Sequence, residues 1–154
     1  PSPIAELQEL PAAAFTPRGS TALLDAIGKS IHLIETEFAK AIQNDEMSVV
    51  TIIITDGEEN CSQFFSYEAI AKQIKEREET GKWTFSFIGC DFDALEISER
   101  LNIRRENVRN FEKRNYGIMS GFMDDSMARY AKAKSDGSFK KRILNFFSDE
   151  DANL

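Results

Sequence analysis

Residues 48–60 read SVVTIIITDGEEN and carry the strongest structural signal in the chain. Every residue from 49 to 55 is Val, Ile or Thr, which favours a β-strand. The absence of polar alternation is typical of a parallel strand that is covered on both faces. Asp56-Gly57 ends this run, at the sheet edge where open α/β folds bind ligands. Asp-Gly is also a common turn dipeptide, so this stretch alone leaves both a metal ligand and a solvated turn aspartate open.

Helices and strands alternate on both sides of this strand. Upstream, apolar residues recur at steps of three and four from Leu23 to Phe38, which predicts a helix over residues 21–43. Downstream, the pattern predicts a helix over 66–80, a strand over 83–90, a helix over 93–101, a short strand over 107–111 and a helix over 117–133. This alternation predicts an α/β fold with a doubly wound, mostly parallel sheet and helices on both faces.

The length, charge and composition of the chain argue against several classes of protein. The chain has 154 residues and a net charge of −7, which fits one domain with a sizeable core and argues against non-specific nucleic-acid binding. No apolar run approaches the roughly 20 residues of a membrane span, and no signal peptide is visible. Cys61 and Cys90 fit free thiols in the cytoplasm. We expect a domain over residues 1–135 and a tail or terminal helix over residues 136–154, with neither nucleic acid nor membrane as a partner.

A second segment, Gly19-Ser20-Thr21, precedes the first long helix. A hydroxyl at the start of that helix and a carboxylate at the end of the next strand converge on the same sheet edge. Hard oxygen ligands of this kind suit Mg²⁺, which makes Thr21 and Asp56 candidate metal ligands. The alternative for Ser20 or Thr21 is a plain N-cap of the helix.

Four more residues are candidates for a second shell or rim around such a site: Ser20, Asp25, Glu58 and Glu59. Each has a simpler alternative. Asp25 lies near the start of a predicted helix, where the attraction between a carboxylate and the positive end of the helix dipole is enough to explain an acidic residue. Glu58 and Glu59 also fit a solvated acidic loop.

Three segments together resemble the later part of a von Willebrand factor A (vWA) domain of a bacterial subgroup. They are RGSTALLDAIGKSI (residues 18–31), IIITDGEEN (52–60) and WTFSFIGCDFDALEISERLNI (83–103). The resemblance extends from about Phe15 to Ala133 and implies a protein-binding module that is not an enzyme. It also implies a metal-ion-dependent adhesion site (MIDAS) for Mg²⁺, with Mn²⁺ or Ca²⁺ as substitutes, in which an acidic side chain of the partner completes the metal shell. Thr21 matches the family's threonine ligand, and Asp56 matches its last aspartate.

The chain departs from that family at its start. The D-x-S-x-S ligands belong to a first strand, for which residues 1–20 leave no room, so three of the family's ligands are absent. In the family this strand pairs beside the one that carries Asp56. Without it, residues 49–54 would present an open apolar edge, so we expect the strand that carries Asp56 to lie in the middle of a completed sheet. An upstream segment, another chain or a neighbouring copy would supply the missing strands.

Two other functions stay open from the sequence. Asp91 and Asp93 form a D-x-D pattern after the strand over residues 83–90, which resembles the nucleophile motif of haloacid-dehalogenase phosphatases. The simpler alternative for this pair is a turn and a helix N-cap. A purely structural subunit of a split domain is the third possibility. His32 is the only histidine, which excludes a Ser-His-Asp triad.

Overall fold

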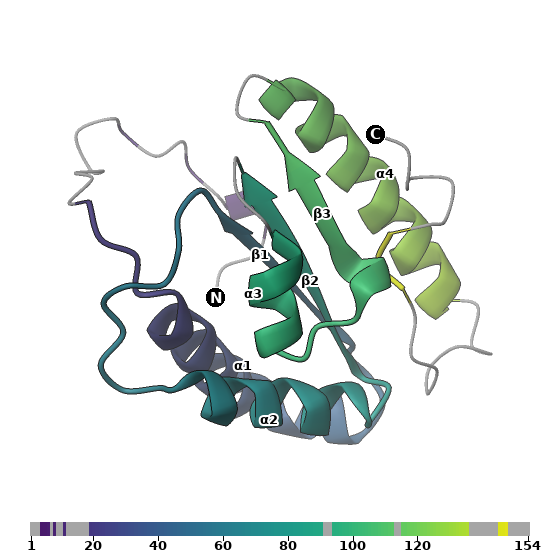
Figure 1. Cartoon of the computed structure of the whole chain (residues 1–154). Helices are drawn as coiled ribbons and strands as arrows, with labels where there is room; N and C mark the ends of the chain where they lie inside the picture. The colour runs from purple at the N-terminus through teal and green to yellow at the C-terminus, as the bar shows by residue number, and fades with distance from the viewer. Residues whose placement is uncertain are drawn as a thin grey trace.

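The computed structural model describes residues 4–6, 8, 11, 19–90, 94–112, 115–135 and 145–147. Its centre is a three-stranded parallel sheet in the order β1-β2-β3, formed by Val49–Thr55, Trp83–Cys90 and Val108–Phe111 (Figure 1). The helices are α1 (Leu23–Gln43), α2 (Tyr67–Glu78), α3 (Ala94–Arg100) and α4 (Tyr116–Ser135), with short 3-10 turns at Ile4–Glu6 and Arg105–Asn107. The predicted α/β class and the parallel sheet are confirmed.

The helices cover both faces of the sheet, as predicted. On one face, apolar side chains of α1, α2 and α3 pack against Val49 and Ile53 of β1 and against Phe85 of β2. On the other face, α4 packs over Ile88, together with the segment 145–147. All residues of β2 are buried, because this strand has a neighbour on each side and helices above and below.

β1 lies at one border of the sheet (Figure 1). The backbone N–H of Val49 donates to Lys82 O at 2.8 Å, which turns Val49 toward β2. Because backbone groups of successive strand residues point to alternate sides, those of Val50, Ile52 and Ile54 point away from β2. Within the described residues no strand pairs with that side. Among the described strands β1 is therefore a border strand, which differs from the expected position of this strand in the middle of a completed sheet.

Residues that favour helix termini stand at both ends of α2. Ser66 caps α2, since its hydroxyl accepts from Ala69 N at 3.2 Å. Gly81 follows α2 with φ of +70°, a left-handed conformation that glycine adopts without a steric penalty. Its N–H donates to Glu78 O at 2.9 Å. The helix and the next strand are thus joined by a tight turn.

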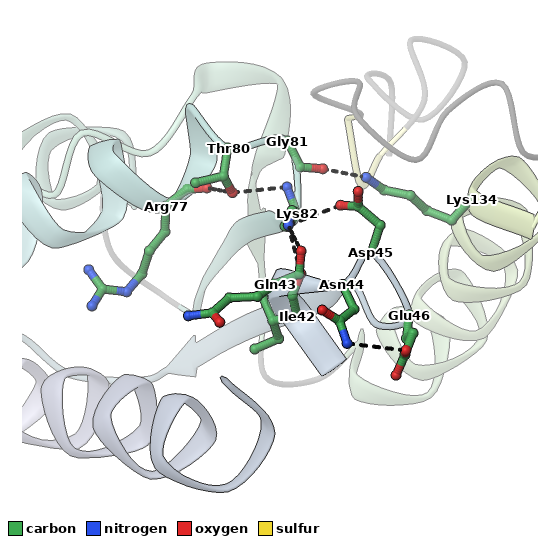
Figure 2. Close-up of polar contacts among 10 residues, drawn as sticks. All are labelled: Ile42, Gln43, Asn44, Asp45, Glu46, Arg77, Thr80, Gly81, Lys82 and Lys134. Carbon is green, nitrogen blue, oxygen red and sulfur yellow. Dashed lines mark hydrogen bonds and ion pairs between the residues drawn. The ribbon is translucent and has the colours of Figure 1, made fainter. Parts of the chain in front are cut away.

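A lysine cluster closes the amino-terminal end of the sheet (Figure 2). Lys82 Nζ donates to the last carbonyls of α1, Ile42 O at 2.7 Å and Gln43 O at 2.9 Å, and forms an ion pair with Asp45 Oδ1 at 3.0 Å. A cation at this position also complements the negative end of the helix dipole. Lys134 Nζ donates to Gly81 O at 2.7 Å and ties α4 to the turn that precedes β2.

Phe146 and Phe147, within the tail or terminal helix predicted over residues 136–154, belong to the core. Phe146 and Phe147 are 1% and 2% exposed and pack with α4. The N–H of Phe146 donates to Asn107 Oδ1 at 2.7 Å, and the Arg109 guanidinium lies 4.6 Å from the centre of the Phe147 ring. The remaining residues of 136–154 lie outside the described part. No helix among the described residues is both long and apolar enough to cross a bilayer.

The helix–loop packing can be tested at Gly28. A β-carbon there would lie 2.6 Å from the Phe65 ring, which is packed against the core. Gly28→Ala should therefore lower the free energy of unfolding by about 1–3 kcal/mol through overpacking. The matched control is Gly121→Ala on α4, where a β-carbon meets nothing within 4 Å. It should be neutral or raise stability by roughly 0.5–1 kcal/mol. Urea unfolding of both variants decides, and equal effects would contradict the packing described here.

Candidate functional site

The candidate site begins at the turn that follows β1. Thr55 Oγ1 donates to Gly57 O at 2.8 Å and accepts from Gly57 N at 3.3 Å, which closes the turn around Asp56. Asp56 is exposed at the carboxyl end of the sheet. A β-carbon at position 57 would lie 3.1 Å from Thr21 Oγ1, so glycine lets the Thr21 hydroxyl approach the turn closely. The structure thus places Thr21 beside the Asp56-Gly57 turn, at the edge where the sequence suggested that the two segments meet.

Reciprocal hydrogen bonds hold Thr21 in place. The N–H of Thr21 donates to Asn60 Oδ1 at 2.9 Å, and the N–H of Asn60 donates to Thr21 O at 3.1 Å. These bonds use the backbone of Thr21 and do not engage its hydroxyl.

The alternative interpretation, in which Ser20 or Thr21 is a plain N-cap of α1, is wrong. The N-cap position of α1 is Ala22, and no side chain of that residue caps the helix. Glu59 performs this role from the loop after β1, since its Oε2 accepts from Leu24 N at 2.9 Å. A carboxylate suits this position because the helix N-terminus presents unsatisfied N–H groups and positive partial charge.

Glu59 also organises its own loop. Its carboxylate accepts from Cys61 N at 2.9 Å, from Ser62 N at 2.7 Å and from the Ser62 hydroxyl at 2.7 Å. Burial opposes the charged form, but these hydrogen bonds and the one from Leu24 outweigh it and hold the pKa of Glu59 below its ordinary value. Glu59 is therefore partly buried and braces the loop, in the sense that its hydrogen bonds fix the loop against α1. Its neighbour Glu58 is exposed, as expected for an acidic loop.

Asp25 is the counterpart of Glu59 on the helix. Its Oδ1 accepts from Phe64 N at 2.9 Å and Phe65 N at 3.1 Å, and its Oδ2 accepts from Gln63 N at 3.1 Å. Asp25 is only 5% exposed; burial opposes its ionisation, yet these bonds lower its pKa. The helix dipole alone does not account for a carboxylate with three N–H donors from one loop.

Ser62 links the Glu59 carboxylate to the backbone of Asp25, because its hydroxyl donates to Glu59 Oε2 at 2.7 Å and accepts from Asp25 N at 3.0 Å. Sequence patterns gave no sign of Ser62, since its partner Asp25 lies 37 residues away in the chain. The carboxylates of Asp25 and Glu59, two of the second-shell or rim candidates, thus accept hydrogen bonds from the N-terminus of α1 and from the loop after β1.

The remaining oxygens fit only part of a magnesium site. Mg²⁺ requires about six oxygen ligands in octahedral geometry. Of the candidates, Thr21 and Asp56 offer a hydroxyl and a carboxylate, while Ser20 and Glu58 are exposed at the rim. Within the described part of the chain, no group of three or more His, Cys, Asp or Glu side chains could hold a metal. Asp91 and Asp93, the alternative pair, lie outside the described residues.

Two clefts lie away from this edge, and charged residues line both. One, of about 370 Å³ between α2 and α3, contains the buried Glu78. Burial raises the pKa of Glu78 despite the N–H of Phe85 at 3.1 Å and the Arg104 guanidinium at 3.4 Å. The other, of about 360 Å³, lies between the loop after α1 and the end of α4, where burial lowers the pKa of Lys134.

No family model, curated protein or solved structure matches this chain. The described fold is a three-stranded parallel sheet with helices, which is compatible with a Rossmann-like arrangement. The vWA likeness therefore rests on the sequence motifs alone. Among the described residues, Cys61 and Cys90 are not joined in a disulfide.

The substitution Glu59→Gln tests whether the Glu59 carboxylate stabilises the loop after β1. Glutamine keeps the shape but presents one acceptor oxygen and an NH₂ group to the donors that Glu59 now satisfies. The free energy of unfolding should fall by about 1–3 kcal/mol. The matched control is Glu58→Gln, the exposed neighbour, which should change stability by less than about 0.5 kcal/mol. Chemical denaturation of the two variants measures the difference. Equal effects would mean that Glu59 does not brace the loop.

The same carboxylates predict a pH dependence. Asp25 and Glu59 have lower pKa values in the folded chain than their ordinary values of 3.8 and 4.5. Their stabilisation is therefore complete above the ordinary values and is lost as the pH falls through the folded-state values. The stability gap between wild type and Glu59→Gln should be constant above about pH 5 and should shrink below about pH 4. Urea midpoints across this range provide the measurement; a gap that widens toward acid would contradict the assignment.

Proposed function

We propose that this chain is a vWA-like protein-interaction module that binds a partner at the rim formed by Thr21 and Asp56 and catalyses no reaction. The observation that supports it most is the close approach of the Thr21 hydroxyl to the turn that contains Asp56, at the carboxyl end of a parallel sheet. Open α/β sheets bind their ligands at this edge. The braced loop from Glu59 to Phe65 holds the rim in a fixed shape before any partner arrives, which reduces the entropy lost on binding.

The proposed partner is a protein that offers an acidic side chain, with Mg²⁺ at the rim and Mn²⁺ or Ca²⁺ as substitutes. Thr21 and Asp56 would supply two oxygens, which leaves most of the shell to water and to the partner. The chain alone should therefore bind the metal only weakly. We place the module in the cytoplasm, and its net charge of −7 opposes nucleic acid and anionic membranes as partners. No described residue favours the alternative phosphatase.

The proposal also includes a strand that completes the sheet beside β1. The candidate sources are an upstream segment, another chain or a neighbouring copy. The outward-pointing backbone groups of β1 support this part, because such groups template strand addition.

Paramagnetic broadening by Mn²⁺ tests the rim, because NMR detects weak binding and localises it. In ¹⁵N spectra of the full chain, added Mn²⁺ should first broaden the amides of Thr21, Asp56 and Gly57. Asp56→Asn and Thr21→Val should each abolish this selectivity, since each removes one of the two oxygen ligands. Excess Mg²⁺ should restore the wild-type signals by competition.

The matched control is Glu58→Gln, which removes an exposed charge next to the turn and should leave the broadening at Thr21 in place. Broadening that instead centres on the Glu78 cleft, or that persists in Asp56→Asn, would refute metal binding at the rim formed by Thr21 and Asp56. Calorimetric binding of Mg²⁺ at micromolar concentration would show that further ligands exist.

A further inference from the structure

We infer that Arg100 and Tyr67 together form a binding site for one carboxylate group of the partner. Arg100 is the last residue of α3 and is exposed, and α3 lies next to α2 on one face of the sheet (Figure 1). Its guanidinium lies 3.6 Å from the centre of the ring of Tyr67, the first residue of α2. At this distance the cation rests against the face of the ring, which attracts it electrostatically. The inference rests on the proposed function only for the acidic nature of the partner.

The N–H groups of Arg100 are available to a ligand. In the described part of the chain no carbonyl or carboxylate accepts a hydrogen bond from Arg100, whereas Arg77 and Arg104 each form an ion pair with a glutamate. A guanidinium carries five N–H donors in one plane, and pairs of them match the two oxygens of a carboxylate. Stacking on a ring uses the flat face of this group and leaves the donors at its rim for an anion.

Tyr67 holds the guanidinium in a fixed place. Its ring is partly buried and packs against the core between the sheet and helices α1 to α3. Ser66, the residue before it, caps α2 with its hydroxyl. An arginine that moves freely in solvent loses side-chain entropy when it binds an anion, and an arginine that is already stacked loses less. The pair is therefore preorganised for binding.

The charges around the pair favour a carboxylate over a phosphate. Burial raises the pKa of Tyr67, and the positive charge of Arg100 opposes that rise. Three carboxylates add to it, those of Glu59, Glu58 and Glu96, so they lie within electrostatic reach of the ring. They repel a phosphate group, which carries between about 1.5 and 2 negative charges at neutral pH, more strongly than a singly charged carboxylate. One arginine among glutamates thus suits a single carboxylate.

The site lies close to the rim formed by Thr21 and Asp56. The loop that starts at Asp56 leads directly into Tyr67, and the charge of Glu58 in that loop acts on the Tyr67 hydroxyl. A partner segment with one carboxylate at the rim can therefore place a second one on Arg100. The positive charge of Arg100 also offsets the repulsion between an acidic partner and a chain with a net charge of −7. The partner that fits both positions presents an acidic stretch rather than one isolated acid.

Titration of the full chain with sodium acetate tests the site without a partner or a metal. NMR follows the arginine Nε–Hε groups and the Tyr67 ring protons at neutral pH, with chloride keeping the ionic strength constant. Acetate should shift the Arg100 signal at least about threefold more than that of Arg105, which is also exposed but is not stacked on a described ring. Inorganic phosphate at the same concentration should shift it less. Equal shifts at the two arginines, or larger shifts with phosphate, would overturn the inference.

Two variants separate the charge of Arg100 from its stacking. Arg100→Lys keeps the charge but loses the planar donors, and Tyr67→Leu removes the ring but keeps an apolar side chain against the core. Each should raise the apparent Kd for acetate at least about threefold, read on the Tyr67 ring in the first variant and on Arg100 in the second.

The matched control is Arg105→Lys, which should leave the Kd for acetate unchanged. Arg100→Lys alters an exposed side chain, so its result does not depend on how well the Tyr67 variant folds. An Arg100→Lys chain that binds acetate like the wild type would refute the site. The Mn²⁺ experiment reports on the rim separately, so failure of the acetate site is distinguishable from failure of the proposed function.

Discussion

The parallel pairing of β1 with β2 is the constraint on which the rest of this structure depends. A parallel neighbour forces the chain to return through a helix to the same end of the sheet, so both strands finish at one edge. That return is α2, and the loop that leads into it must pass the N-terminus of α1. The position of Asp56, the approach of Thr21 and the capping of α1 all follow from this path.

The loop after β1 divides its acidic residues between two tasks. Glu59 and Asp25 each accept hydrogen bonds from backbone N–H groups of the other's segment. The Ser62 hydroxyl also accepts from the backbone N–H of Asp25. These hydrogen bonds take the place of an N-cap residue on α1 itself. They also hold the acidic loop after β1 in a fixed conformation. Asp56 and Glu58 remain exposed on that loop, which gives the edge of the sheet its negative character.

Local patterns allowed most of the fold to be predicted from the sequence. The cap at Ser66, the turn at Gly81 and the alternation in β2 each involve residues that are close in the chain. The meeting of Thr21 with the Asp56 turn also followed from the topology. The roles of Asp25 and Glu59 did not, because their partners lie 35 to 40 residues away and hydrogen bonds to backbone N–H groups leave no trace in residue identity. The burial of Phe146 and Phe147 depends equally on distant contacts.

The position of Phe146 and Phe147 affects how this protein would be made. They cover the face of the sheet opposite α1, and Asn107 accepts the N–H of Phe146. A ribosome must therefore translate past Phe147 before that face is closed. Until then the nascent chain exposes an apolar face to the chaperones that attend synthesis. Folding of this domain can be completed only after residues 146 and 147 have been added, however early its first helix forms.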